Sequence, residues 1–386
     1  MAKVGGATYK TDNMIVVVKK SDGAENILDA ADYRFGIQTS LDQENNNLMI
    51  EEIESIIGKA IFKVEHETLV EEAEALLDGR VRAAIYNEAF MEIIEESIEG
   101  YSNKIKIIHQ YGIETKIEEE EKDIEKPFNV YISGIDVAGE ITTNSRSDVN
   151  IIMTVNPGTH QILLTTTPRD YYVKIPEISD DQKDKLTHAG IYGVDISMDT
   201  LEALYDINIS YYARVNFTSL MKIVDALGGI DVYSEHAFDT GKYSFVQGVN
   251  HMNGEQALAF SRERYSFEDG DNQRGKNQEA VLKAILEKAM SPAILTSAGQ
   301  IIASVSDSVE TNMTQEEMVK LINMQLDSGA RWSIDMTSAT GIGDNQPCYS
   351  SGTEILCVMQ PDAVSVNSVR AKMQDVLQAE SMRINK

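Results

Sequence analysis

Arginine and glutamine residues gather in one stretch of the sequence, residues 253–278, which reads NGEQALAFSRERYSFEDGDNQRGKNQ. A short helix is predicted over 254–261, with Asn253 as its N-cap. Arg262 and Arg264 follow this helix directly. If the chain is extended there, residues two apart point the same way, so both guanidinium groups can bind one anion.

A second helix is predicted to begin near Asp271 or Asn272 and to run to about Met290. Arg274 and Gln278 are four residues apart on it and therefore share one face. The positive end of a helix favours phosphate, so this first turn predicts an anion site. Surface arginines paired with the neighbouring acidic residues would account for the same pattern, and this alternative stays open.

Charged residues also flank three predicted strands, at 128–135, 149–155 and 160–166. Asp136 follows the first strand, Arg146 and Asp148 precede the second, and Arg169 follows the third. The turn Asn156-Pro157-Gly158 makes the last two strands an antiparallel hairpin. If the first strand pairs in the right orientation, all four charged residues meet at one end of the sheet.

Two carboxylates with arginines nearby suggest a divalent cation that holds a polyphosphate, because Mg²⁺ prefers one or two carboxylates together with phosphate oxygens. The alternative is a surface pair between Arg146 and Asp148 at the end of a strand. The sequence alone leaves both interpretations standing.

The elements that must position these residues alternate along the chain. In the first third, strands are predicted over 14–19, 33–39, 62–66, 81–86 and 104–109, with helices over 42–58, 69–77 and 90–98 between them. This alternation implies βαβ units and a partly parallel sheet. The acidic run 118–121 marks a boundary, so we predict an accessory α/β domain over 1–126 and a second domain over 127–386.

Composition limits the classes of function. The chain has 386 residues and a formal net charge of -28, which disfavours nonspecific binding to nucleic acid or to an anionic membrane surface. No apolar run reaches the roughly 18 residues of a transmembrane helix, and the N-terminus lacks a secretory signal. We expect either a cytosolic protein or one whose membrane anchor lies upstream of this sequence.

Cys348 and Cys357 are the two cysteines of the chain. Their spacing across a Ser-Ser-Gly turn suits a disulfide in a hairpin, which a reducing cytosol would not maintain. A pair of buried free thiols fits the sequence equally well. For protein made under oxidising conditions we predict the disulfide.

Several ordered motifs between residues 129 and 290 resemble one known family, the LytR-CpsA-Psr (LCP) proteins of Gram-positive cell envelopes. The motifs are SRSDVNIIM at 145–153, TTTPRD at 165–170, KLTHAGIYG at 185–193, YYARVNF at 211–217, VDALGGIDV at 224–232 and GEQALAFSRER…DNQRGKNQ at 254–278. The resemblance implies a mixed central β-sheet flanked by helices. The smaller α/β domain ahead of it resembles the accessory domain of streptococcal capsule-assembly members.

The resemblance also implies an activity. Members of this family are phosphotransferases that use Mg²⁺ to move a glycopolymer, either a capsular polysaccharide or a teichoic-acid-like polymer, from an undecaprenyl pyrophosphate carrier to peptidoglycan. They act on the extracellular face of the membrane, where N-terminal helices anchor them. Because this sequence has no such helix, the resemblance predicts an excised ectodomain.

Site residues carry over by motif. The resemblance implies that Asp136 and Asp148 bind the metal or activate the acceptor, and that the arginines neutralise the phosphates, with Arg146 and Arg262 among the catalytic groups. The residues expected to bind the pyrophosphate are Arg146, Arg169, Arg262, Arg264, Arg274 and Gln278. The apolar residues Val281, Leu282 and Ile285 continue the face of Arg274 and Gln278, so they are expected to line a pocket for the lipid.

Two other functions use the same residues. A binding protein could hold a polyprenyl phosphate or an anionic polymer without turnover, and a hydrolase could cleave the carrier pyrophosphate with water as the acceptor. The paired acids favour an enzyme, since a protein that only binds anions has no reason to add negative charge to its site.

Overall fold

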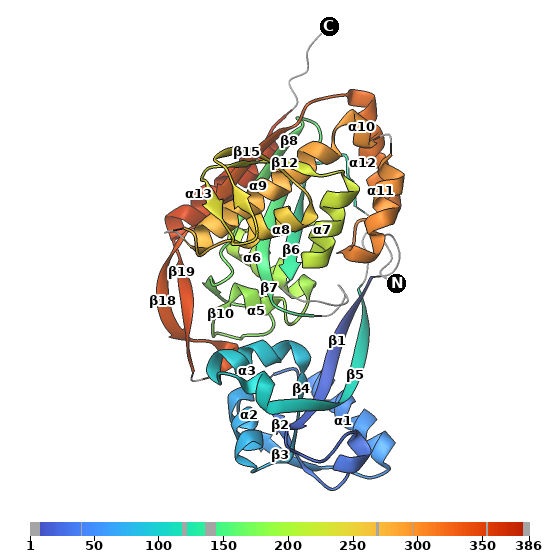
Figure 1. Ribbon diagram of the computed structural model, residues 1–386, viewed down its shortest axis with the longest axis vertical. Helices are drawn as coiled ribbons and strands as arrows, with labels where there is room; N and C mark the ends of the chain where they lie inside the picture. Colours follow the sequence, from blue (N-terminus) through green and yellow to red (C-terminus); the bar gives the residue numbers. More distant parts are fainter. Residues whose placement is uncertain are drawn as a thin grey trace.

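The computed structural model describes residues 8–39, 41–117, 122–135, 144–267, 270–295, 297–352 and 354–380. Two α/β parts follow one another along the chain, the first in blue and teal at the bottom of Figure 1 and the second above it. The predicted fold class, a mixed sheet flanked by helices and preceded by a smaller α/β part, is confirmed.

A five-stranded sheet in the order β3-β2-β4-β1-β5 forms the centre of the first part. Its strands are β1 (Thr8–Lys19), β2 (Arg34–Gln38), β3 (Phe62–His66), β4 (Ala83–Asn87) and β5 (Ile105–Ile117). β2 pairs in parallel with β3 and β4, whereas β1 pairs antiparallel with β4 and β5. The sheet is therefore partly parallel, as the alternation of elements predicts.

Helices cover both faces of this sheet. They are η1 (Ile27–Ala30), α1 (Gln43–Ile57), α2 (Leu69–Asp78), η2 (Glu88–Phe90), α3 (Met91–Ser97) and α4 (Tyr101–Lys104). Successive residues of β1 point to opposite faces. Met14 and Val16 therefore join one apolar cluster with α1, and Ile15 and Val17 join a second cluster with α2 and α3.

The second part is built on a six-stranded sheet in the order β16-β11-β6-β7-β8-β17. Its strands are β6 (Phe128–Ile135), β7 (Ser147–Asn156), β8 (Gln161–Thr166), β11 (Tyr211–Asn216), β16 (Val309–Thr311) and β17 (Ser333–Ser338). β7 pairs antiparallel with β6 and β8, which confirms the predicted hairpin. β6 pairs in parallel with β11, and β8 with β17, so this sheet is mixed.

Long helices pack on both faces of the second sheet. The helices are α5 (Leu186–Ala189), α6 (Val194–Tyr205), α7 (Phe217–Ala226), α8 (Gly254–Arg262), α9 (Asp271–Ala289), α10 (Pro292–Leu295), α11 (Ala298–Val305), η3 (Ser306–Ser308), α12 (Gln315–Ser328), η4 (Tyr349–Ser351) and α13 (Ala363–Gln378). Ile152 of β7 packs with α6 and α13, whereas its neighbour Ile151 packs with α9 and α12. The alternation of β7 thus builds both cores.

Short two-stranded ribbons complete the second part. They are formed by β9 (Tyr172–Val173) with β10 (Asp184–Lys185), β12 (Ile230–Ser234) with β15 (Gly248–Met252), β13 (Phe238–Asp239) with β14 (Ser244–Phe245), and β18 (Gly341–Pro347) with β19 (Ile355–Pro361). Within the described ranges, no helix is long and apolar enough to span a bilayer.

The two parts share a packed interface. Asn144, just before β7, donates a hydrogen bond of 2.6 Å to the buried carboxylate of Asp12 in β1. Phe90 meets the ring of Tyr192 edge-on at 5.9 Å, and Ile191 is buried in the cluster of α2 and α3. Ile124 packs in the core of the second part, two residues ahead of the predicted boundary at 126.

The predicted disulfide between Cys348 and Cys357 is wrong in this structure, where both thiols are free. In the ribbon, Cys357 of β19 pairs with Asn345 of β18, three positions before Cys348. Three residues of strand separate two positions by roughly 10 Å, and an odd offset turns their side chains to opposite faces. Cys348 is accordingly buried, whereas Cys357 is exposed and contacts Asn345, so the pair cannot reach disulfide geometry.

Candidate active site

The charged residues flanking β7 and β8 lie at one edge of the second sheet. β6 and β8 run antiparallel to β7, so the ends of both strands face the edge at which β7 begins. The structure brings Arg146 and Asp148, at the start of β7, together with Arg169, three residues after β8. Asp136 follows β6 directly but lies outside the residues that the structure describes.

A β-bulge sets the position of Asp148. Gly134 pairs with Val149 and Ile135 pairs with Ser147, so Asp148 is the extra residue of β7 at this point. A bulge locally bends a strand and redirects a side chain. The backbones approach closely here, since a Cβ at Gly134 would lie 2.6 Å from the Val149 side chain. Glycine at position 134 therefore permits the bulge.

Three cations act on the Asp148 carboxylate. Its Oδ1 accepts hydrogen bonds from Arg169 Nη1 at 3.0 Å and from Thr187 Oγ1 at 3.2 Å. Burial raises the pKa of Asp148, but the charges of Arg169 and Arg146, the hydrogen bond from Arg169 and the charge of Arg274 together outweigh burial and lower it below its ordinary value. Asp148 is therefore ionised at neutral pH.

Buried hydroxyl groups fix the start of β7 between the two charged residues. Ser147 is fully buried, and its Oγ lies 2.7 Å from Ser133 Oγ and 2.8 Å from Tyr131 OH. Gly190, after α5, packs so closely that a Cβ would lie 2.7 Å from Ser145 O and 2.8 Å from Ser147 N. Since Ser147 is anchored, Arg146 and Asp148 on either side of it leave the sheet at defined positions.

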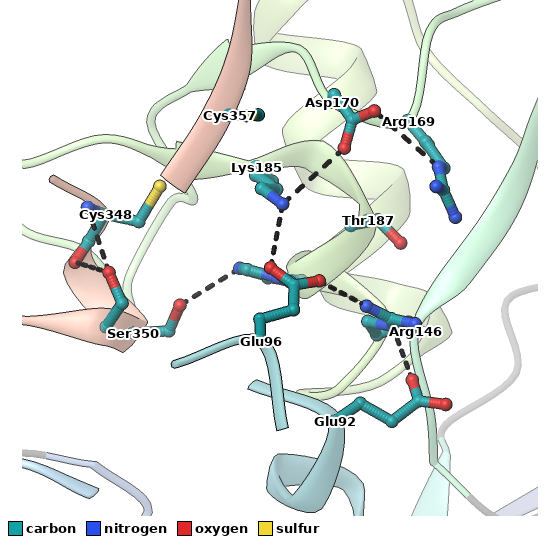
Figure 2. A network of polar contacts seen from close by, with 12 residues as sticks. Glu92, Glu96, Arg146, Arg169, Asp170, Lys185, Thr187, Cys348, Ser350 and Cys357 are labelled. Atoms are coloured by element: carbon teal, nitrogen blue, oxygen red, sulfur yellow. Dashed lines mark hydrogen bonds and ion pairs between the residues drawn. The ribbon is translucent and has the colours of Figure 1, made fainter. Parts of the chain in front are cut away.

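Ion pairs connect the site to the first part of the molecule (Figure 2). The Arg146 guanidinium contacts Glu92 through Nε and Glu96 through Nη1, the latter at 2.6 Å. Glu96 also contacts Lys185 Nζ at 2.9 Å, and Lys185 lies 3.8 Å from Asp170. Burial raises the pKa of Glu96, but Lys185, His188 and Arg146 together lower it below its ordinary value. Glu96 is thus ionised where α3 meets the site.

The arginines at the end of α8 contact aromatic rings. The Arg262 guanidinium lies 4.2 Å from the ring centre of Phe217, the residue that follows β11 at the same sheet edge. Arg264 donates a hydrogen bond of 2.7 Å to Tyr265 OH. Helix α8 includes Arg262, and only Glu263 after it is extended. The two guanidinium groups lie against different rings.

Helix α9 is fastened to the strand that leads to Arg169. The buried carboxylate of Glu279 accepts hydrogen bonds from Thr166 N, at 3.1 Å, and from Ser338 Oγ, at 3.5 Å. Burial raises the pKa of Glu279 to about 7. One residue earlier lies Gln278, half-buried, and one turn before it lies Arg274, whose charge acts on Asp148. The structure thus places the predicted Arg274 near enough to Asp148 for its charge to lower the pKa of that carboxylate.

The three apolar residues expected to line a lipid pocket face two clusters. Val281 is 2% exposed and packs with Ile285 against α7, α8 and β12. Leu282 packs instead with the residues of the sheet and α12. Because successive residues of a helix point about 100° apart, the adjacent Val281 and Leu282 face different clusters. A hydrocarbon chain that follows this face would have to run between the two clusters.

A buried histidine lies beside this network without forming a catalytic relay. His188 Nδ1 lies 2.6 Å from Asp184 Oδ1 and 3.0 Å from Ser350 Oγ. Both partners therefore meet the same ring nitrogen, whereas a serine nucleophile relay uses the two nitrogens separately. Asp184, His188 and Ser350 are almost fully buried, so we interpret their hydrogen bonds as structural contacts that join β10, α5 and η4.

Several side chains at the site were not predicted from the sequence. Lys185 and Thr187 lie in the motif KLTHAGIYG, which carried the family resemblance, but no role was inferred for either residue. Glu92 and Glu96 gave no signal, because glutamates are common on exposed helices and only the docking of α3 brings them to Arg146. Glu279 directly follows Gln278, and only its burial distinguishes it from a surface acid.

The acidic side chains at this site determine whether it can bind a metal ion. Among the described residues, no group of three or more His, Cys, Asp and Glu side chains is arranged to hold a metal ion. Asp148 offers an ionised oxygen donor, which suits Mg²⁺ bound through one or two carboxylates and phosphate oxygens. Such a two-carboxylate arrangement would need Asp136.

The fold and this cationic sheet edge define a member of a known family. The chain matches the LytR_cpsA_psr family over residues 96–371, and it belongs to this family. It is 35% identical over 194 residues to a polyisoprenyl-teichoic acid–peptidoglycan teichoic acid transferase, TagU, of Bacillus cereus, and this match covers 50% of the chain and 62% of the relative. A TagU of Enterococcus faecalis is 36% identical, with 58% of this chain and 74% of the relative covered.

Solved structures share the fold. TagV of B. subtilis superposes with a TM-score of 0.56 at 29% identity, covering 66% of this chain and 98% of TagV. TagT bound to LIIa-WTA superposes with a TM-score of 0.53 at 27% identity, covering 67% of this chain and 94% of TagT. The shared region is thus nearly the whole of these solved chains, whereas about a third of this chain lies outside it.

Proposed function

We propose that this protein is a phosphotransferase that attaches a glycopolymer, carried by a polyprenyl pyrophosphate such as undecaprenyl pyrophosphate, to peptidoglycan. The observation that carries the proposal is the ionised Asp148 among Arg146, Arg169 and Arg274 at one sheet edge. Cations so placed can neutralise the charge of a pyrophosphate and of the phosphate that leaves. The names of the TagU relatives, which are teichoic acid transferases, support the same reaction.

The proposed reaction exchanges one bond to phosphorus for another. An acceptor hydroxyl of peptidoglycan bonds to the phosphorus that carries the sugar, the phosphoanhydride bond breaks, and polyprenyl phosphate leaves with the added negative charge. The proton of the acceptor hydroxyl is released to water. Arg169 and Arg146 would bind the phosphates, and Arg262, Arg264, Arg274 and Gln278 would extend the anion site along α8 and α9.

The lowered pKa of Asp148 favours one of its two possible roles. A general base works best when its pKa lies near the working pH. Asp148 is held well ionised by its cationic neighbours, so it is a weak base and a good oxygen ligand. We propose that Asp148, with Asp136, holds Mg²⁺, which when bound would neutralise charge on the phosphate oxygens.

We also propose where the protein works. Peptidoglycan and a lipid-linked polymer meet at the outer face of the cell membrane, so the proposed reaction places this chain there. The polymer is a teichoic-acid-type chain or a capsular polysaccharide. The TagU names of the relatives support the first of these.

A transfer assay tests the proposal and separates it from its alternatives. The protein is incubated with a polyprenyl pyrophosphate-linked polymer labelled in its sugars, with peptidoglycan, and with or without Mg²⁺. We expect label on washed peptidoglycan only when all components are present. Cleavage of the donor at the same rate without peptidoglycan would indicate a pyrophosphatase, and binding without turnover would indicate a carrier protein.

A further inference from the structure

Five ion pairs of the site form a chain of alternating charge that crosses between the two parts of the molecule, and Figure 2 shows it from Arg146 to Arg169. Starting from Arg146, this chain of ion pairs passes through Glu96 at 2.6 Å, Lys185 at 2.9 Å, Asp170 at 3.8 Å, Arg169 at 3.7 Å and Asp148 at 3.0 Å. The charge of Arg146 also acts on Asp148, at the other end of this chain. Five members belong to the second part, and Glu96 comes from α3 of the first.

Each oxygen of Glu96 has its own partner. Oε1 contacts Arg146 and Oε2 contacts Lys185, so a single carboxylate joins the two cations. Glu92, one helical turn earlier, contacts Nε of the same guanidinium. Among the contacts between described residues, the two glutamates use Nε and Nη1 of Arg146, so its Nη2 amino group can bind another anion.

The docking of α3 makes this arrangement rigid. Phe90, next to α3, packs against Tyr192, and Ile93 and Ile94 of α3 are fully buried in the interface cluster with Ile191. Lys185 is buried, with 8% of its side chain exposed. Charged groups held by packed neighbours stay in place. An arginine on the open surface would instead have to lose side-chain entropy when it binds a ligand.

We propose that Glu96, assisted by Glu92, is a positioning residue that holds Arg146 in place for the pyrophosphate. The inference rests on the proposed function and assigns part of it to the first part of the chain. Glu96 acts through Arg146 and not on the substrate itself. The accessory part thus completes the site by orienting one of its arginines.

A double-mutant cycle tests this role. Glu96→Gln keeps the size of the side chain, but it replaces one of the two accepting oxygens by an NH₂ group that only donates, so the contact with Arg146 or with Lys185 is lost. We expect Glu96→Gln to lower kcat/KM for polymer transfer about 10-fold when Arg146 is present and less than about 2-fold when Arg146 is alanine, since residues that act as a unit are not additive. Binding of farnesyl pyrophosphate should show the same coupling.

Matched variants separate positioning from general effects. Glu99 lies three residues after Glu96, and its exposed side chain carries the same charge. Glu99→Gln should change neither transfer nor binding. Thermal unfolding of every variant checks the fold. Glu92→Gln should show a smaller coupling with Arg146, because the Glu92 side chain is 45% exposed and that of Glu96 27% exposed.

The outcomes distinguish this inference from the proposed function. If the parent protein neither transfers the polymer nor binds farnesyl pyrophosphate, the proposed function fails and the inference fails with it. If the parent is active but the effects of Glu96→Gln and Arg146→Ala simply add, only the positioning role fails. Tighter binding by Glu96→Gln would also overturn it, because the glutamate would then compete with the ligand for Arg146.

Discussion

Arg169 Nη1 donates a hydrogen bond of 3.0 Å to Asp148 Oδ1, which joins the end of one strand of the central hairpin to the start of the other. The Asp148 side chain is 15% exposed, and the Arg169 side chain is 22% exposed. Because the pair is shielded from solvent, the charge of Arg169 acts strongly on Asp148 and keeps it ionised, although burial by itself raises the pKa of this carboxylate.

Removing this charge should stop the reaction without unfolding the protein. Asp148→Asn keeps the shape and one acceptor oxygen for Arg169 but removes the negative charge. We expect transfer to fall by a factor of about 100 or more. The measurement is Mg²⁺-dependent transfer of labelled polymer. Asp136→Ala should have a similar effect.

A matched aspartate provides the control. Asp181 is fully exposed and pairs with Lys174 at 2.7 Å, and it takes no part in the ion pairs that join Arg146 to Asp148, so Asp181→Asn should transfer polymer at the parent rate. Near-normal turnover by Asp148→Asn would remove this carboxylate from the mechanism.

The raised pKa of Glu279 predicts a pH dependence of stability. Its pKa rises from 4.5 to about 7 on folding, so the folded state holds the proton more tightly than the unfolded chain. The stability from the neutral carboxyl is complete below about pH 4.5 and is lost as the pH rises through about 7. Glu279→Gln, which cannot ionise, should therefore gain up to about 3 kcal/mol relative to the parent between pH 5 and pH 8.

Denaturant unfolding followed by the fluorescence of Trp332 measures this difference. Trp332 is the single tryptophan of the chain and packs in the core of the second part, so its signal reports that part. Glu287→Gln changes an exposed glutamate on the same helix and should track the parent at both pH values. A constant difference between Glu279→Gln and the parent across this range would contradict the prediction.

The sequence predicts the fold where local patterns determine it. The hairpin of β7 and β8 and the helices that begin after Asn253 and near Asp271 follow from turn residues, capping and periodicity. The sequence does not predict the partners of Arg146, because Glu92 and Glu96 contact it only when the two parts of the molecule pack together. The separation of the two cysteines likewise depends on strand register, which spacing alone does not give.

The register of β18 and β19 gives a prediction for the thiols. Cys357 is exposed and should react with a maleimide in the native protein, whereas Cys348 should react only after unfolding, since burial raises the pKa of its thiol and also excludes the reagent. Intact mass after labelling counts the modified cysteines. A mass lower by the two thiol hydrogens, with no labelling even after unfolding, would show that the disulfide forms after all.

Binding of polyprenyl pyrophosphates of increasing chain length tests the predicted lipid pocket. A polyprenyl tail that starts at Arg274 and Gln278 would follow α9 past Ile285, which is partly buried beside Val281. Burial of apolar surface at about 25 cal/mol per Å² should make affinity rise with each added isoprene unit. Ile285→Trp fills this path, so it should weaken binding of long polyprenyl pyrophosphates and spare short ones in a titration series. Leu326→Trp, on the exposed side of α12, should leave the whole series unchanged. Affinities that ignore tail length in the parent and in Ile285→Trp would leave an anion site without a lipid path.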